Sequence, residues 1–254
     1  MGTDDRRSLI FDDLEAEQNA LDAVLAALTD DAWSHESGAS GWSVADVVLH
    51  LAQSEEVVVA SSRDDGRATE WRQLGSSVDD AMEAMVRAER GNQATPASIL
   101  ERWRTARRAA VAALRGADPG KPLVWVAAAL KPGTLATTRL AETWAHALDI
   151  TGPLGIAYPD TVRLAHIAWL GHRTLPYALT RAGEPPRAVR CDLTAPDGTT
   201  WHLGPPDADS VITGPVGDFC RVGARRLAPE RSRLVTRGPH AATALRVLRN
   251  YADM

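Results

Sequence analysis

The most informative segment of this chain runs Ala141-Glu142-Thr143-Trp144-Ala145-His146. On an α-helix, residues four apart share one face. Glu142 and His146 could therefore bind the same metal ion from one side of a helix. Such a spacing is common, so a metal site here requires a further ligand from another part of the chain.

His50 is the candidate for that further ligand, in Gly41-Trp42-Ser43-Val44-Ala45-Asp46-Val47-Val48-Leu49-His50. Ser43 followed by Asp46 resembles a capping box, and it predicts a helix from Val44 to about residue 60. We expect Trp42, just before the cap, to act as a hydrophobic staple. If the fold brings His50 to Glu142 and His146, two imidazoles and one carboxylate form the ligand set of a catalytic zinc site with an open position.

Apolar periodicity predicts helices around both segments, and it places them in one bundle. Five helices are expected before residue 155, four of them long. Four principal helices with an antiparallel alternation indicate a four-helix bundle. The expected ranges are 8–28, 44–60, 77–90, 95–114 and 134–152. We therefore assign residues 1–155 to a helical domain.

The pattern changes after residue 155, where short alternating segments replace long helices. The Asp197-Gly198 turn between two alternating runs is a β-hairpin signal. We expect strands at 188–194, 199–203, 210–213 and 232–236, with helices at 161–180, 215–227 and 240–251. The fold class is therefore mainly α, with a small α+β domain over residues 156–254.

Composition limits the classes of function. The net charge is −5 and the pI about 5.8, which argues against nucleic-acid binding. No apolar run is long enough to span a membrane, and no secretory signal pattern opens the chain, so a cytoplasmic protein is expected. Cys191 and Cys220 are too few for a disulfide scaffold, and we expect both to be buried. The sequence does not indicate an oligomeric state.

These residues together resemble a known family. Trp42-Ser43-Val44, His50-Leu51 and the distal Glu142/His146 pair are similar to the mycothiol-dependent maleylpyruvate isomerase type of the DinB-like metalloproteins. Leu193-Thr194-Ala195-Pro196-Asp197-Gly198 and Ile212-Thr213-Gly214-Pro215 resemble an actinobacterial metal-binding subset of that group. The resemblance covers nearly the whole chain.

The resemblance implies a four-helix bundle that holds a divalent metal, most often zinc, at His50, Glu142 and His146. It implies a second domain similar to sterol-carrier-protein folds. A carboxylate at position 142, where many relatives have histidine, is associated with the branch that uses mycothiol as a cosubstrate. Such a metal lowers the pKa of a bound thiol or water. The activity implied is thiol transfer to, or isomerisation of, a small electrophilic metabolite.

Catalytic residues beyond the ligands are not assigned by the motifs. Candidates within one turn of the ligands are Gln53, Arg139 and Asp149. Arg139 could anchor an anionic substrate or be a solvated cation. Asp149 could orient His146 or be a surface charge. Glu55 and Glu56 are expected on a solvated face, although either could serve as a general base.

Two other functions stay open at this stage. One keeps the metal but uses activated water or Lewis-acid chemistry on a specialised metabolite, without a thiol. The other is a non-catalytic metal- or ligand-binding module. An open coordination position separates both enzymes from a closed structural site.

Overall fold

The computed structural model describes residues 3–63, 69–70, 73–90, 94–125 and 128–250, and for residues 3–8 and 79 only the backbone. The chain divides into two compact units. One comprises the described residues up to Tyr158, and the other those from Pro159 onward. The predicted division of the chain into domains at 155/156 stays a prediction.

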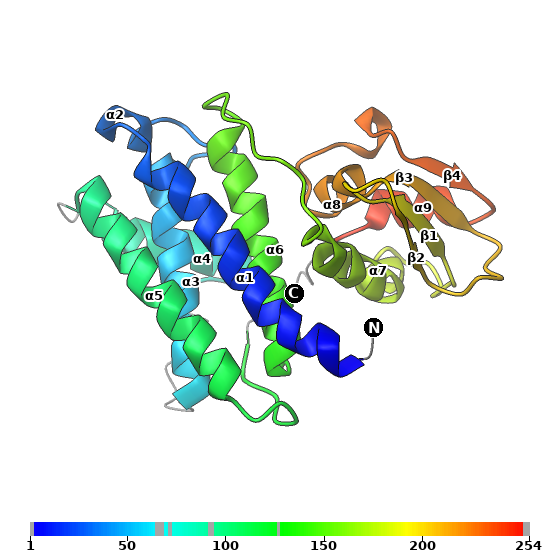
Figure 1. The fold of residues 1–254 in the computed structure, drawn as a ribbon, viewed down its shortest axis with the longest axis horizontal. Helices are drawn as coiled ribbons and strands as arrows, with labels where there is room; N and C mark the ends of the chain where they lie inside the picture. The colour runs from blue at the N-terminus through cyan, green and yellow to red at the C-terminus, as the bar shows by residue number, and fades with distance from the viewer. Residues whose placement is uncertain (1–2, 64–68, 71–72, 91–93, 126–127, 251–254) are drawn as a thin grey trace. The chain divides into compact units, whose positions relative to one another are not determined.

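The first unit is helical (Figure 1). Long helices α3 and α5 pack on each other, and α1 packs on α6 and α5. The helices are α1 (Thr3–Ala26), α2 (Asp30–Trp33), α3 (Val44–Arg63), α4 (Val78–Glu89), α5 (Pro96–Gly116) and α6 (Pro132–Thr151). Five match the predicted ranges closely, and the single-turn α2 was not predicted.

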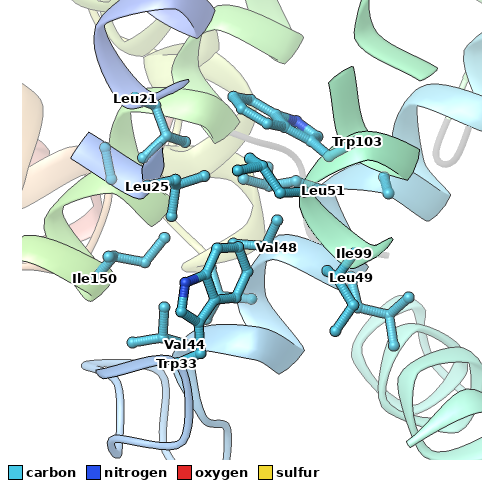
Figure 2. Close-up of a cluster of buried hydrophobic side chains, with 14 of the residues drawn as sticks. Leu21, Leu25, Trp33, Val44, Val48, Leu49, Leu51, Ile99, Trp103 and Ile150 are labelled. Atoms are coloured by element: carbon cyan, nitrogen blue, oxygen red, sulfur yellow. The ribbon is translucent and has the colours of Figure 1, made fainter. Parts of the chain in front are cut away.

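Apolar side chains from α1 to α6 fill the centre of this unit. Leu21 and Leu25 of α1 meet Val48 and Leu51 of α3, as Figure 2 shows. Trp103 of α5 is fully buried in the same cluster. The long helices contribute residues spaced three or four apart, so one stripe of each long helix faces the core. This packing sets the faces that α3 and α6 turn toward each other.

The second unit combines helices with a four-stranded sheet. The strand order is β2-β1-β3-β4; β1 pairs with β3 in parallel, and the two outer pairs are antiparallel. Helices α7 and α8 contact each other and the sheet. The elements are α7 (Leu164–Arg181), β1 (Arg190–Thr194), β2 (Thr200–Leu203), β3 (Val211–Pro215), α8 (Val216–Gly223), a 3₁₀ turn (Pro229–Arg231), β4 (Val235–Arg237) and α9 (Ala241–Val247).

Two helices of this unit end earlier than predicted. α8 stops at Gly223 because Arg225 takes a positive φ of 60°, which a right-handed helix cannot continue. α9 stops at Val247 because Leu248, at φ −52° and ψ 132°, lies outside the helical region. The fold class itself, a mainly helical chain with a small C-terminal α+β part, is confirmed. The likeness to sterol-carrier proteins stays a prediction.

Within the described ranges, every helix falls short of the length and apolar character needed to cross a bilayer.

Candidate metal centre

The start of α3 fixes the position of His50. Ser43 N–H and Oγ both donate to Asp46 Oδ2, at 2.9 and 2.8 Å, and Asp46 N–H donates to Ser43 Oγ at 3.2 Å. These reciprocal bonds satisfy amides that the first turn of a helix leaves free. The predicted capping box is confirmed. His50 follows on the second turn and is buried.

Glu142 and His146 of α6 meet His50 of α3. Glu142 Oε2 is 3.4 Å from His146 Nε2 and 3.9 Å from His50 Nε2. One ligand atom from each residue lies within 4.8 Å of the others. Among the described residues, this is the one group of three or more His, Cys, Asp or Glu side chains with that spacing. The predicted site depended on the fold bringing His50 to Glu142 and His146. The structure does so.

The charges of His50 and Glu142 suit metal ligation. Burial lowers the pKa of His50 to about 4, so its imidazole is neutral at neutral pH. Burial alone would raise the pKa of Glu142, but the two imidazoles outweigh it and hold that pKa well below its usual range. A neutral imidazole and an ionised carboxylate are the forms that bind metal. A two-histidine, one-carboxylate donor set fits a divalent ion such as Zn²⁺.

The three side chains differ in their access to solvent. The Glu142 side chain is 34% exposed, against 9% for His50 and 11% for His146. The carboxylate is therefore the member of the group that reaches water. This exposure is what a site needs if a further ligand is to enter it.

Asp149 holds the ring of His146. Its Oδ2 lies 2.9 Å from His146 Nδ1, and both residues are buried. Burial alone would lower the pKa of His146, but Asp149 and Glu142 outweigh it and raise that pKa. Gly38 N–H donates to the Asp149 carbonyl at 2.7 Å, and a Cβ at position 38 would lie 3.1 Å from Asp149 Cα. With Nδ1–H donated to Asp149, Nε2 is the ring nitrogen directed toward Glu142.

The indole ring of Trp42 packs beside both imidazoles of the group. Its role as a hydrophobic staple stays a prediction. Its ring centroid is 5.1 Å from that of His50 and 6.5 Å from that of His146. Its Nε1–H donates to Glu83 of α4. Trp42 also borders a hollow of about 310 Å³ whose lining includes Asp46 and Arg90. The indole therefore shields both imidazoles from water on one side.

Gln53, a catalytic candidate, is bonded to α4. Its Nε2 donates to the Met85 carbonyl at 3.1 Å and to Glu89 Oε1 at 2.9 Å. The side chain is buried. These bonds tie α4 to α3 one turn beyond His50.

Arg139, the second candidate, is buried instead of solvated. Its Nε donates to Glu55 Oε1 at 3.2 Å, and its guanidinium lies 5.7 Å from the Trp125 ring centroid. Glu55 is fully buried, so the expectation of a solvated face is wrong for this residue. Glu56 is exposed, as expected, and pairs with Arg102 at 2.7 Å.

Sequence reasoning gave Glu55 no firm role and passed over Gln18, its partner on α1. Gln18 Nε2 donates to Glu55 Oε1 at 3.4 Å. A signal was present, because each polar residue interrupts an apolar helical stripe. Gln18 lies between Leu14 and Leu21, and Glu55 between Leu51 and Val58. Polar residues on a buried stripe are candidates for an internal network.

Two further histidines and both cysteines make contacts outside the His50, Glu142 and His146 group. His172 Nε2 is 2.9 Å from the Val189 carbonyl. His202 Nδ1 is 2.6 Å from Asp192 Oδ1 on the exposed side of the hairpin. Cys191 and Cys220 are free and buried, as predicted, and burial raises the pKa of Cys191 to about 12.

The helical unit matches a known family model. The model of the mycothiol maleylpyruvate isomerase N-terminal domain matches residues 14–151, which include all three members of the His50, Glu142 and His146 group. The chain belongs to this family. The predicted resemblance is therefore confirmed.

Relatives and solved structures agree with this membership. Two uncharacterized proteins of the actinobacterium Mycobacterium tuberculosis, from strains CDC 1551 / Oshkosh and ATCC 25618 / H37Rv, are each 35% identical over 226 residues. Those residues cover 85% of this chain and 84% of each relative. Crystal structures of the mycothiol-dependent maleylpyruvate isomerase and of a histidine-to-alanine mutant share the fold at a TM-score of 0.59. They are 14% identical to this chain and cover 94% of it and 97% of their own length.

Proposed function

We propose that this protein is a divalent-metal-dependent enzyme that uses mycothiol as a cosubstrate and transfers the thiol to, or isomerises, a small electrophilic metabolite. The observation that carries the proposal is the convergence of His50, Glu142 and His146 in a chain of the mycothiol maleylpyruvate isomerase N-terminal domain family. Zn²⁺ is the ion that this donor set favours.

His50, Glu142 and His146 would hold the ion, each through one ligand atom. When bound, the ion supplies a Lewis acid that lowers the pKa of a thiol or water entering the site. His50 offers a neutral Nε2, and Glu142 offers an ionised oxygen on the side that reaches solvent. One negative ligand leaves a divalent site with net positive charge, which favours an anionic thiolate.

The residues around the ligands have positioning roles in this proposal. Asp149 accepts from His146 Nδ1–H and so keeps Nε2 directed into the site. Trp42 covers both imidazoles and limits the approach of water on that side. Gln53 acts through α4, because its amide donates to that helix.

A cobalt-substituted sample tests the thiol part of the proposal. We expect mycothiol to change the visible absorption of the bound Co²⁺ and to release or absorb binding heat, saturating at about one thiol per metal. His202→Ala, outside the group, is the matched control and should respond as the wild type does. An unchanged spectrum without heat would contradict thiol use. Metal binding without a thiol response would favour the water-based alternative.

A further inference from the structure

Two buried polar atoms of α3 lack a hydrogen-bond partner among the described residues, and one of them belongs to the candidate metal centre. They are Nδ1 of His50 and Oε1 of Gln53. His50 is 7% exposed and Gln53 is 2% exposed, so both side chains are removed from bulk water. Buried polar atoms are seldom left without a hydrogen bond in a folded protein. Each of the two atoms therefore needs a partner.

Helical geometry makes the two side chains neighbours. Gln53 follows His50 by three positions in α3. Such positions differ by about 60° around the helix axis and by about 4.5 Å along it, so they share one face. The other unpartnered buried oxygen of α3, Glu55 Oε2, belongs to a position about 140° from His50 around the axis. Gln53 is therefore the unpartnered acceptor of α3 on the face of His50.

The same spacing carries a formed hydrogen bond on α6. His146 and Asp149 are also three positions apart, and His146 Nδ1 lies 2.9 Å from Asp149 Oδ2. In both imidazoles Nε2 is the nitrogen near Glu142, at 3.4 Å for His146 and 3.9 Å for His50. Each ligand helix thus carries an imidazole with Nε2 toward Glu142, followed three residues later by a buried side chain with an acceptor oxygen.

The amide of Gln53 is oriented by α4. Its Nε2 donates to the Met85 carbonyl at 3.1 Å and to Glu89 Oε1 at 2.9 Å. Both partners are acceptors, so the nitrogen of the amide lies on their side. Because Oε1 is bonded to the same carbon as Nε2, it faces away from these two acceptors. The amide therefore uses both of its donors on α4 and keeps its acceptor for another group.

The tautomer of His50 decides whether its Nδ1 and this oxygen attract each other. A neutral imidazole carries one proton, on either ring nitrogen. With the proton on Nε2, Nδ1 is an acceptor and does not bond to a second acceptor. Ligation of a metal through Nε2 requires a lone pair there, so the proton is then on Nδ1. In that tautomer the two unpartnered atoms are a donor and an acceptor.

We propose that Gln53 is a positioning residue of the candidate metal centre, whose Oε1 accepts a hydrogen bond from His50 Nδ1–H and keeps Nε2 directed at the ion. The inference rests on the metal site of the proposed function and on no particular reaction. Gln53 serves His50 as Asp149 serves His146. A neutral amide is a weaker acceptor than a carboxylate, and its donors link the ligand to α4.

Zinc affinity, measured by competition with a chelator of known affinity, tests the proposal. Gln53→Met is similar in size but offers only a weak acceptor, so affinity should fall by about 10–100-fold. The double variant Gln53→Glu with Glu89→Gln restores an acceptor at position 53 and reverses the link to residue 89. It should bind zinc at least as tightly as the wild type. Glu89→Gln alone is the matched control and should also bind as the wild type does.

A spectrum of zinc-loaded protein labelled with ¹⁵N-histidine gives a second readout, which a role of Gln53 in joining α3 to α4 alone would not move. We expect a slowly exchanging Nδ1–H signal for each of His50 and His146. Gln53→Met should remove or shift the His50 signal and keep the other, whereas Asp149→Asn should do the reverse. If Gln53→Met does not fold, the wild-type spectrum decides, because the proposal requires a protected Nδ1–H on His50.

The outcomes separate this inference from the proposed function. A wild type that binds no zinc would overturn both. Zinc binding by the wild type with equal affinity in Gln53→Met would overturn the inference alone. Equal losses in Gln53→Met and in the double variant would also overturn it, because the acceptor at position 53 would then make no difference.

Discussion

Two groups among the described residues join a histidine to a carboxylate. They differ in the distance along the chain between their members and in their burial. The bundle group takes His50 from α3 and Glu142 and His146 from α6. The hairpin pair joins His202 and Asp192 across neighbouring strands, with Arg190 2.8 Å from the same Asp192 oxygen. The first group is assembled from distant parts of the chain, and the second from residues ten apart.

Burial separates the two groups further. The imidazoles of the bundle group are nearly inaccessible, whereas the His202 side chain is 59% exposed. In the bundle, burial moves the pKa of His50 far from its ordinary value. For His202, water screens the charges and a neighbouring arginine already neutralises the carboxylate. A short distance between a histidine and a carboxylate therefore identifies a functional site less well than the meeting of several buried ionisable side chains from distant segments does.

The largest expected difference is in bound metal. His50→Ala, Glu142→Ala and His146→Ala each remove one of three ligands, so affinity should fall by more than the about 100-fold seen when outer partners are lost. His202→Ala and Asp192→Ala should keep the wild-type content. Elemental analysis of zinc-loaded, dialysed protein measures this. Full metal content in all three bundle variants would remove the proposed site.

A smaller effect is expected from the residue that orients His146. Asp149→Asn cannot accept the Nδ1–H bond as a carboxylate does, so metal affinity should drop by about 10–100-fold. Competition with a chelator of known affinity gives the value. Asp192→Asn changes the same residue type beside the other histidine and should leave the affinity unaltered. A similar drop in both variants would mean that the two groups do not differ as described.

The smallest expected effect is on the free energy of unfolding, through the Asp192 and His202 pair of the hairpin. Burial alone would raise the pKa of Asp192, but Arg190 and His202 outweigh it and lower that pKa. A lowered carboxyl pKa stabilises the fold above the unfolded value of about 4, and the contribution is lost as pH falls through the folded value. Asp192→Asn should therefore cost about 0.5 kcal/mol at neutral pH.

Urea unfolding of the wild type and Asp192→Asn at neutral pH and near pH 3 checks that sign. The gap between the two midpoints should narrow at the lower pH, because the Asp192 carboxyl begins to take up a proton there while the asparagine is neutral throughout. A gap that widens on acidification would contradict the assignment of Asp192 as an ionised partner of Arg190.

Much of the fold followed from local patterns. The capping box at Ser43 and Asp46 and the apolar stripes of α1, α3, α5 and α6 predicted helices close to those observed, because caps and periodic burial act within a few residues. The end of α8 was missed, because the positive φ of Arg225 is a backbone conformation that arginine does not signal.

The candidate site was predicted less completely. His50, Glu142 and His146 were named from spacing and resemblance, and the role of Asp149 was left open between two readings. Glu55 was expected on the surface because charged residues seldom lie inside. Its partners Gln18 and Arg139 come from other helices, so no local pattern could pair them with it.

The sequence by itself determined the long helices, the hairpin turn, the negative net charge and the residues able to ligate a metal, since these depend on composition and short-range spacing. The tertiary structure alone decided which of those residues meet. Packing of α3 against α6 brings His50 to Glu142 and His146, and burial then sets their charges. Desolvation and convergence arise from contacts between distant segments, and these exist only once the chain has folded.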